Sequence, residues 1–502
     1  MGNLKQLASQ TFVYGLSSII GRFLYYFLVP LYTNVFKTSE YGIITELYAY
    51  VTFLMILLTY GMETGFFRFS KTEEDKDKVY STVLICLFVS SLLFLVAGWI
   101  FTPYISEVLH YTNHQNYILM FVIILSVDAF VSIPFARLRQ QNKALKFAVF
   151  KLISIFVNIL LNLFFILLLP KLAQNSAFFD SIYSQDFGVG YVFVSNLITS
   201  LLSLALFIPD FFSIKFKFDS VLLKRMLLYS LPLVVSGFCG MINEFFDRIA
   251  MKFFYTIPAG VADANDYVLS ELGIYGANAK IAVLMTLFVQ CFRYAADPFF
   301  FNHTGEKDFN KLFANTNKYL FAFGLFIFLL VMSSIDIVKY FIGSEYWSGL
   351  KVVPLLLIGH FIVGLIYLQS FWYKIHNLTL YGILIFVIGT VVTIIVNWLF
   401  VPKYGYMACA YANLSCYIVM FLITFFWGRK YIPCQYDYRR IAIYFFTALF
   451  CYLMFCFTDS FAMPIKLSCN LLLTLIYCLV VFRCENLGPR LKILISRFKS
   501  KI

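Results

Sequence analysis

Charged residues are scarce in this chain. Asp, Glu, Lys and Arg make up 13% of its 502 residues, whereas hydrophobic residues make up 61%. A typical soluble domain is about one quarter charged, so this composition excludes an ordinary soluble protein. Apolar stretches long enough to cross a bilayer recur from end to end, and they are continuous rather than alternating. This pattern favours α-helical spans over a β-barrel.

Patterns typical of metal sites and enzymes are also missing. The eleven cysteines stand singly in or beside apolar segments, and no CxxC motif or Cys/His cluster is present. We therefore expect no metal, no disulfide framework and no cofactor. The five histidines are scattered, and no nucleophile and base are arranged for covalent catalysis. The sequence predicts a protein that is not an enzyme.

Charged and turn-forming breaks divide the chain into about fourteen spans, so we predict an all-α polytopic membrane protein. The longest loops on one side, 171–187 and 255–270, are too short to form a soluble domain. Transport or chemistry must then occur in or at the membrane. The predicted spans are 10–34, 41–66, 80–102, 116–137, 147–169, 188–210, 227–254, 271–301, 316–341, 350–372, 379–400, 407–428, 441–458 and 464–482.

Lys and Arg are divided unevenly between the two alternating sets of loops. The set that includes both termini, with the adjoining helix ends, carries 28 of the 39 bases, and the opposite set carries seven. The positive-inside rule therefore places both termini in the cytoplasm. Contact with anionic membrane lipid explains the net charge of +13, and no nucleic-acid partner is needed. The four bases within spans are Arg22, Arg248, Lys280 and Arg293.

The chain contains an internal repeat at an offset of about 234 residues. Tyr41-Gly42 aligns with Tyr275-Gly276, Glu63 with Asp297 and Asn162 with Asn397. We predict two six-helix lobes related by a pseudo-two-fold axis along the membrane normal, with two helices appended. Transporters with this symmetry bind between the lobes and alternate access to the two sides. The predicted divisions are an N-terminal lobe at 1–210, a C-terminal lobe at 211–440, two further spans at 441–482 and a basic cytoplasmic tail at 483–502.

Three sets of residues carry a resemblance to a known family. They are Leu231-Pro232, Asp247-Arg248, GIYGANAK at 273–280 and Asp297-Pro298; Pro30 with SEYG at 39–42; and Asn397, Pro402 and Tyr404-Gly405. In these elements the chain resembles the polysaccharide-transport flippases of the multidrug/oligosaccharidyl-lipid/polysaccharide (MOP) exporter superfamily. The resemblance covers essentially the whole chain. One departure is that Pro170 and Gly188 are separated by a longer loop than Pro402 and Gly405, which puts strict symmetry of the lobes in doubt.

The resemblance implies a MATE-like bundle around a central cavity. It implies that undecaprenyl-diphosphate-linked oligosaccharide moves from the cytoplasmic to the outer leaflet of the bacterial inner membrane, for surface polysaccharide or lipopolysaccharide synthesis. A proton or sodium gradient would drive alternating access, and the polysaccharide assembly machinery would be a partner. The alternatives are a drug or cation exporter or a lipid II flippase of the same superfamily, and, less expected, a membrane polysaccharide polymerase or ligase.

Bases inside spans are the predicted ligands of the diphosphate and sugar. Intramembrane charges usually face a cavity, and the guanidinium fork suits phosphate. Arg22 has no acid within helical reach, and hydroxyl groups lie on its face of the helix. The alternative is that each base is tied structurally to an acid or a carbonyl. The predicted cleft residues are Arg22, Tyr25, Tyr26, Arg248, Asn278 and Lys280.

Acids within the spans are predicted to act as gates or ion carriers. Glu244, Asp247, Arg293 and Asp297 are the predicted gate or ion-pair residues, because Glu244 lies one turn before Arg248 and Asp297 lies one turn after Arg293. Asp128, Glu46 and Glu63 are the candidates for ion coupling, because a lone buried carboxylate can carry a proton. The alternative is that each of the three neutralises a buried base.

Overall fold

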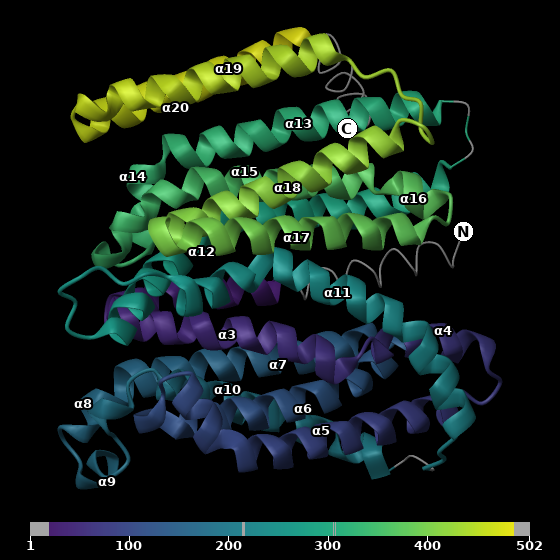
Figure 1. Cartoon of the computed structure of the whole chain (residues 1–502), viewed down its shortest axis with the longest axis vertical. Helices are drawn as coiled ribbons and strands as arrows, with labels where there is room; N and C mark the ends of the chain where they lie inside the picture. Colours follow the sequence, from purple (N-terminus) through teal and green to yellow (C-terminus); the bar gives the residue numbers. More distant parts are fainter. Residues whose placement is uncertain (1–19, 213–215, 305, 307, 486–502) are drawn as a thin grey trace, which may run out of the picture. The chain divides into compact units, whose positions relative to one another are not determined.

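The computed structural model describes residues 20–212, 216–304, 306 and 308–485, and every regular element in these ranges is helical (Figure 1). Residues 20–26 are helical and lead through Phe27 into α2. The α-helices that follow are α2 (Leu28–Val35), α3 (Thr38–Thr59), α4 (Met62–Thr72), α5 (Lys76–Val108), α6 (Gln115–Gln140), α7 (Ala144–Leu163), α8 (Leu169–Ala173), α9 (Ala177–Asp180), α10 (Gly190–Phe212), α11 (Ser220–Phe254), α12 (Ala264–Asn302), α13 (Phe309–Ser333), α14 (Ile335–Val338), α15 (Val353–Gln369), α16 (Phe371–Ile375), α17 (Thr379–Tyr404), α18 (Tyr406–Gly428), α19 (Tyr438–Phe457) and α20 (Met463–Cys484). Short 3₁₀ or π segments are η1 (Thr112–His114), η2 (Phe164–Leu168), η3 (Gln185–Phe187), η4 (Lys339–Phe341), η5 (Ser344–Val352) and η6 (Thr458–Ser460).

Thirteen helices in the described ranges are long and apolar enough to cross a membrane. They correspond one to one with the last thirteen predicted spans, which confirms the polytopic helical fold. The first predicted span, 10–34, begins outside the described residues. Most of the predicted basic tail, 483–502, also lies outside them, beyond Glu485.

Local capping explains where several helices begin. Asp75, Asp219 and Asp437 each precede a helix, and each carboxylate accepts a hydrogen bond from a backbone N–H in the first turn. An acid at this position satisfies an N–H group that would otherwise have no partner. The second predicted span is interrupted between α3 and α4, where Tyr60 and Gly61 adopt positive φ of 32° and 69°.

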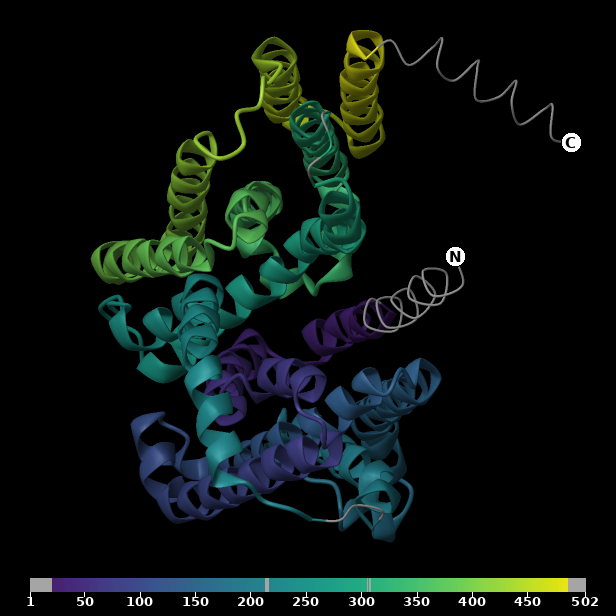
Figure 2. The ribbon, with the colours of Figure 1, turned by 90° about the vertical axis from the view of Figure 1, so that its right-hand side faces the viewer.

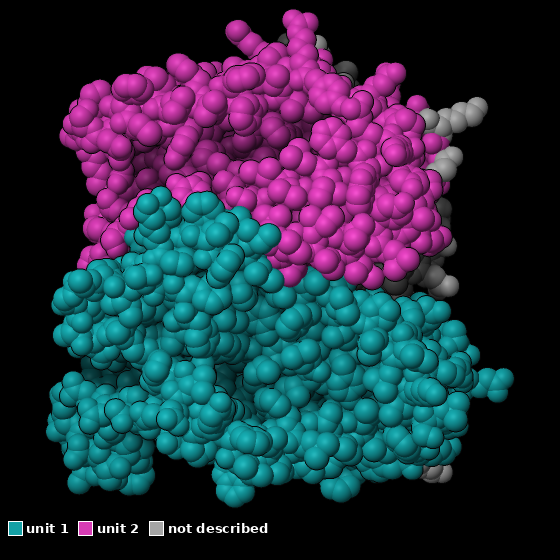
Figure 3. Space-filling view, viewed as in Figure 1, with its two compact units in different colours: residues 1–276, 393–409 teal, residues 277–392, 410–502 magenta. Residues whose placement is uncertain are grey.

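Contacts divide the chain into two compact units (Figure 3). Unit 1 comprises residues 1–276 and 393–409, and unit 2 comprises residues 277–392 and 410–502. These bounds follow packing, whereas the predicted lobes follow the internal repeat. The lobe boundaries therefore stay a prediction.

Unit 1 contains an unusually close helix crossing between α3 and the start of α12. A Cβ on Gly42 would lie 1.9 Å from the carbonyl oxygen of Leu269, and one on Gly273 would lie 1.9 Å from that of Thr38. The hydroxyls of Thr38 and Ser270 are 2.6 Å apart at the same crossing. Small residues permit this approach of two backbones, as in other membrane helix pairs.

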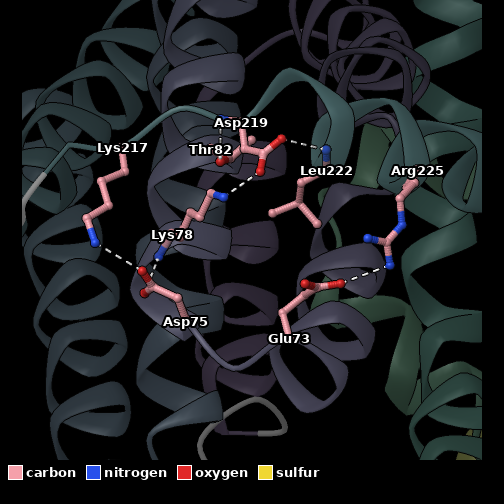
Figure 4. Close-up of polar contacts among 8 residues, drawn as sticks. All are labelled: Glu73, Asp75, Lys78, Thr82, Lys217, Asp219, Leu222 and Arg225. Carbon is pink, nitrogen blue, oxygen red and sulfur yellow. Dashed lines mark hydrogen bonds and ion pairs between the residues drawn. The ribbon is translucent and has the colours of Figure 1, made fainter.

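A polar network fixes the segment that leads into α11 to the turn between α4 and α5 (Figure 4). Lys78 Nζ lies 2.5 Å from Asp219, Lys217 Nζ lies 3.1 Å from Asp75, and Arg225 Nη2 lies 2.9 Å from Glu73. Both segments belong to the loop set predicted to be cytoplasmic. Their charges hold the beginnings of α5 and α11 together within unit 1.

In unit 2, α13 packs beside both terminal helices, α19 and α20 (Figure 2). Tyr477 of α20 donates a hydrogen bond of 2.8 Å to the carbonyl of Ala322 in α13. At the end of α20, Glu485 lies 2.7 Å from Lys318 of α13 and accepts a hydrogen bond of 2.7 Å from Tyr444 of α19. Three helices are thus joined by one buried carboxylate.

Candidate functional site

A polar cavity of about 600 Å³ lies within unit 1, among spans that are otherwise apolar. Its wall is built by residues 21–25 and by α3, α4, α6, α7 and α10. Two acids, three bases and several hydroxyl groups face it. The polar lining residues are Arg22, Tyr25, Tyr48, Glu63, Asp128, Ser132, Arg139, Lys151, Ser154, Asn196, Thr199, Ser200 and Ser203.

Arg22 and Tyr25, two of the predicted cleft residues, both line this cavity, and both side chains are exposed. Arg22 interacts electrostatically with Glu244 of α11. Within the described ranges, no acid lies within 4 Å of its guanidinium in a salt bridge. The third member of the predicted set in this region, Tyr26, is half-buried and is not part of the cavity wall.

Asp128 and Lys151 face the cavity from α6 and α7 and attract one another electrostatically. The ammonium group of Lys151 also lies 4.1 Å from the ring centre of Phe135. Asp128 is one of the predicted ion-coupling residues, and the structure gives it a basic neighbour. Both groups are within the span region, so their charges compensate one another in a medium that disfavours a lone ion.

Glu63, a second ion-coupling candidate, is paired with Arg139 across the cavity wall. The carboxylate of Glu63 lies 2.5 Å from Arg139 Nη2, and the two side chains are 42% and 32% exposed. The Arg139 guanidinium also lies over the rings of Phe67 and Phe147. Arg139 therefore has a partner, whereas Arg22 contributes an additional positive charge to the cavity.

Arg248 occupies a mostly buried position in α11, where its side chain is 14% exposed. Its guanidinium donates to Asp247 and to the backbone carbonyl of Glu244, each at 2.8 Å. Asp247 is itself buried and accepts a hydrogen bond from Tyr275 of α12. Asp247 thus links α11 to α12 through its hydrogen bond with Tyr275, and its carboxylate neutralises the neighbouring Arg248.

Glu46, the third ion-coupling candidate, forms a buried ion pair with Lys252 at 3.3 Å. Tyr111 and Tyr50 donate to its two carboxylate oxygens at 2.6 and 3.1 Å. Glu46 is therefore the partner of a buried base on another helix, and its part in ion coupling stays a prediction.

The remaining predicted residues lie in unit 2. Asn278 is buried and donates a hydrogen bond of 2.7 Å to the backbone carbonyl of Tyr346, while Lys280 is exposed. Asp297 accepts a hydrogen bond from Tyr367, whose ring lies 4.5 Å from the Arg293 guanidinium. Arg293 and Asp297 are therefore brought together around one tyrosine. The ammonium group of Lys374 lies 4.2 Å from the same ring.

Comparison with known proteins places the chain in a family. Residues 7–303, more than half of the chain, match the family model described as "Polysaccharide biosynthesis protein". The chain belongs to this polysaccharide biosynthesis protein family. One curated relative, an uncharacterized membrane protein of Methanocaldococcus jannaschii, is 21% identical in an alignment of 498 positions that covers 91% of this chain and 89% of the relative.

Solved structures show that this member of the polysaccharide biosynthesis protein family has the fold of the MOP superfamily. The lipid II flippase MurJ in its inward closed conformation matches with a TM-score of 0.72 and 16% identity, over 94% of this chain and 99% of that one. A MATE family multidrug resistance transporter in its inward-facing conformation matches with a TM-score of 0.61 and 15% identity, over 84% and 94%. The chain is a multi-pass membrane protein with the fold of flippases and transporters.

The sequence did not mark Arg139 or Lys151 as cavity residues, although both line the wall. Lys151 was grouped with the bases of the predicted cytoplasmic side, because it follows four other bases at 137–146. The structure begins α7 at Ala144, which places Lys151 two turns into the helix. A spacing of seven residues from the helix start is about 10 Å of rise, enough to carry the side chain into the span region.

Proposed function

We propose that this protein moves an undecaprenyl-diphosphate-linked oligosaccharide from the cytoplasmic to the outer leaflet of the bacterial inner membrane. The lipid-linked sugar would then enter synthesis of a cell-surface polysaccharide, such as capsule, O-antigen or lipopolysaccharide. The membership in a polysaccharide biosynthesis family and the MOP fold support this proposal. The observation that carries it is the polar cavity of unit 1 and the excess of bases in its wall.

The charge of the cavity suits an anionic cargo. Arg139 is paired with Glu63, and Lys151 faces Asp128, so the guanidinium of Arg22 adds a net positive charge to the wall. A guanidinium offers paired N–H donors that match the oxygens of a phosphate. The hydroxyls of Tyr25 and Tyr48 lie in the same wall and can bond to sugar or phosphate oxygens.

The Asp128 and Lys151 pair is the candidate for ion coupling in this proposal. A proton or sodium ion on Asp128 would remove the attraction for Lys151, which frees that ammonium group to hold the anionic cargo. The two sites would thereby be linked, because occupation of one changes the charge at the other. Both termini would be cytoplasmic, consistent with the distribution of Lys and Arg.

The proposal is tested by replacing Arg22 in cells that make a surface polysaccharide. We expect Arg22→Ala to reduce surface polymer by at least about tenfold, because a lost charged hydrogen bond is worth roughly 1.5–3 kcal/mol. Arg22→Lys should retain part of the activity, since it keeps the charge without the fork. Arg483→Ala is the matched control, because Arg483 lies in the exposed last turn of α20.

Protein inserted in the membrane must be quantified for each variant, so that lost transport is distinguished from lost protein. Surface polymer at the wild-type level in Arg22→Ala cells would overturn the proposal. A change in drug susceptibility with unchanged polymer would instead favour a drug exporter of the same superfamily.

A further inference from the structure

The segment that breaks the symmetry of the two repeats builds a second pocket in unit 1. In the second copy, Pro402 and Gly405 are separated by two residues, whereas Pro170 and Gly188 are separated by seventeen. The additional chain forms α9 and η3 and folds back over the turn between α2 and α3. The pocket has a volume of about 460 Å³ and lies on the side predicted to face outward.

Aromatic rings form one part of this pocket, which is lined by Phe36, Phe165, Tyr183 and Tyr191. The rings of Phe165 and Tyr183 each stack on that of Tyr191, with centroid distances of 5.7 and 6.0 Å and interplanar angles of 21° and 12°. The stack leaves Tyr183 half-exposed at its end. A ring held in this manner presents a flat apolar surface to the pocket.

Hydrogen bonds hold the loop in place before any ligand arrives. The Tyr191 hydroxyl accepts a hydrogen bond of 2.8 Å from the backbone N–H of Ser184, and Tyr117 donates one of 2.6 Å to the carbonyl of Phe187. Gly188 has a φ of +45°, and a Cβ there would lie 3.0 Å from the Glu40 carboxylate. Glycine at this position therefore leaves room for the carboxylate, and the pocket is preorganised.

Polar groups in the same pocket remain available to a ligand. The side chains of Gln185 and Asp186 are exposed, and in the described part of the chain neither takes part in a hydrogen bond. Glu40 accepts a hydrogen bond of 2.9 Å from the backbone N–H of Lys37 through one oxygen, which leaves its second oxygen facing Gly188. Two carboxylates and one ammonium group give this pocket a net negative charge.

We propose that this pocket is a saccharide-binding subsite for the glycan of the exported cargo. Sugars present hydroxyl groups, which amides and carboxylates bind, and C–H faces, which pack on aromatic rings. The net negative charge disfavours the diphosphate and selects the uncharged part of the cargo. The volume falls within the roughly 300–1,000 Å³ typical of small-molecule sites. The inference rests on the proposed function, because it requires that glycan be delivered to the outer side.

The test uses the full chain in lipid nanodiscs and the free reducing oligosaccharide that mild acid releases from the lipid-linked pool of the host strain. This probe lacks both diphosphate and lipid. We expect calorimetry or intrinsic fluorescence to show binding to the wild type, and about tenfold weaker binding to Tyr183→Ala. Tyr183→Phe keeps the ring and should bind as the wild type does. Phe178→Ala is the matched control, because this aromatic residue of α9 is 67% exposed and does not line the pocket.

A second variant, Gln185→Ala combined with Asp186→Ala, changes only exposed side chains and is expected to weaken binding by a similar factor even if Tyr183→Ala does not fold. Absence of binding to folded wild-type protein, or equal binding by the wild type and both pocket variants, would overturn the subsite. Normal surface polymer in Arg22→Ala cells would count against the proposed function, and the binding assay reports on the subsite separately.

The lipid-linked oligosaccharide, reconstituted in the same nanodiscs, is the second arm of this test. It distinguishes the glycan of the cargo from a free glycan as the natural ligand. If the pocket serves the cargo, Tyr183→Ala must weaken binding of the lipid-linked form as well. Weakening of the free form alone would overturn the assignment to the exported cargo.

Discussion

The ammonium group of Lys252 in α11 lies 3.3 Å from the carboxylate of Glu46 in α3, and the two side chains are 3% and 0% exposed. Further polar groups complete the arrangement: Tyr111 donates to Glu46 at 2.6 Å, and Lys252 donates to Asn265 at 2.6 Å. Glu46 and Lys252 are separated by 206 positions in the sequence. A buried pair of this kind is costly to break, because the remaining ion has no water around it.

Removing one member of this pair should destabilise the protein strongly. We expect Glu46→Gln or Lys252→Met to lower the free energy of unfolding by about 3–5 kcal/mol, the usual cost of leaving a buried charge without its partner. Thermal melting of the purified protein in detergent measures the effect. The double variant Glu46→Gln/Lys252→Met removes both charges and should recover a substantial part of the loss. A double variant no more stable than the worse single one would contradict the pairing.

The crossing of α3 and α12 should tolerate no side chain larger than hydrogen at Gly42 or Gly273. A Cβ at either position would lie 1.9 Å from a carbonyl oxygen of the other helix, so the backbones would have to separate. We expect Gly42→Ala to destabilise the protein by more than the roughly 1–3 kcal/mol typical of overpacking. The yield of folded, monodisperse protein should fall as a result, and this yield is the quantity to measure. The control is Gly237→Ala in α11, where the nearest atom to a Cβ lies at 3.7 Å. Equal yields from these two alanine variants would disprove the close crossing.

Acidification should loosen the polar network that joins α5 to α11. Hydrogen bonds from the Lys78 backbone N–H and the Lys217 ammonium lower the pKa of Asp75 below its usual 3.8, and the Lys78 ammonium does the same for Asp219. Because both pKa values are lower in the folded state, the stabilisation is complete above about pH 4 and is lost as the pH falls through the folded values.

Melting temperature measured from pH 6 to pH 3 tests this network. We expect the Asp75→Asn/Asp219→Asn variant to lose less stability over this range than the wild type, because two of the groups that take up protons are gone. Asp75 is exposed and Asp219 is half-buried, so the effect should also shrink in high salt. An identical pH profile in the variant would show that the two carboxylates do not contribute.

The packing of α19 and α20 against α13 in unit 2 should depend on Glu485. Burial opposes its ionisation, but hydrogen bonds from Lys318, Tyr444 and Tyr319 lower its pKa overall, so its stabilising effect is present near neutral pH and is lost on acidification. We expect Glu485→Gln to lower the free energy of unfolding by about 3 kcal/mol, because Lys318 is 4% exposed and loses its partner.

The control is Arg440→Ala. Arg440 is 37% exposed and should contribute less than about 1 kcal/mol. Melting in detergent compares the two, and equal losses would contradict the special role of the buried pair.

The spans were predictable because each depends only on neighbouring residues. A helix in lipid must satisfy its backbone groups internally, so a long apolar stretch already specifies it. Lys151 shows the limit of this reasoning. Its position near other bases indicated a cytoplasmic helix end, while the start of α7 at Ala144 places it beside the cavity. Helix boundaries shift by several residues, and a shift of one turn changes the environment of a long side chain.

Partners between distant segments could not be predicted from composition or spacing. Glu46, Glu63 and Asp128 were equivalent in the sequence as acids within spans. In the structure Glu46 pairs with Lys252, Glu63 pairs with Arg139, and Asp128 faces Lys151. Which base meets which acid depends on how helices pack, and the packing depends on small contacts such as the glycines of α3 and α12.

The sequence by itself determined the helical membrane fold, the approximate limits of the thirteen spans that lie within the described residues, and the resemblance to the flippase family. These follow from local hydrophobicity and from residues at fixed spacing. The tertiary structure decided which predicted residues share a cavity, which charges neutralise one another, and that the extended loop after Pro170 forms a pocket with aromatic walls. Those properties depend on side chains that are distant in the chain, and only the packing of the helices brings them together.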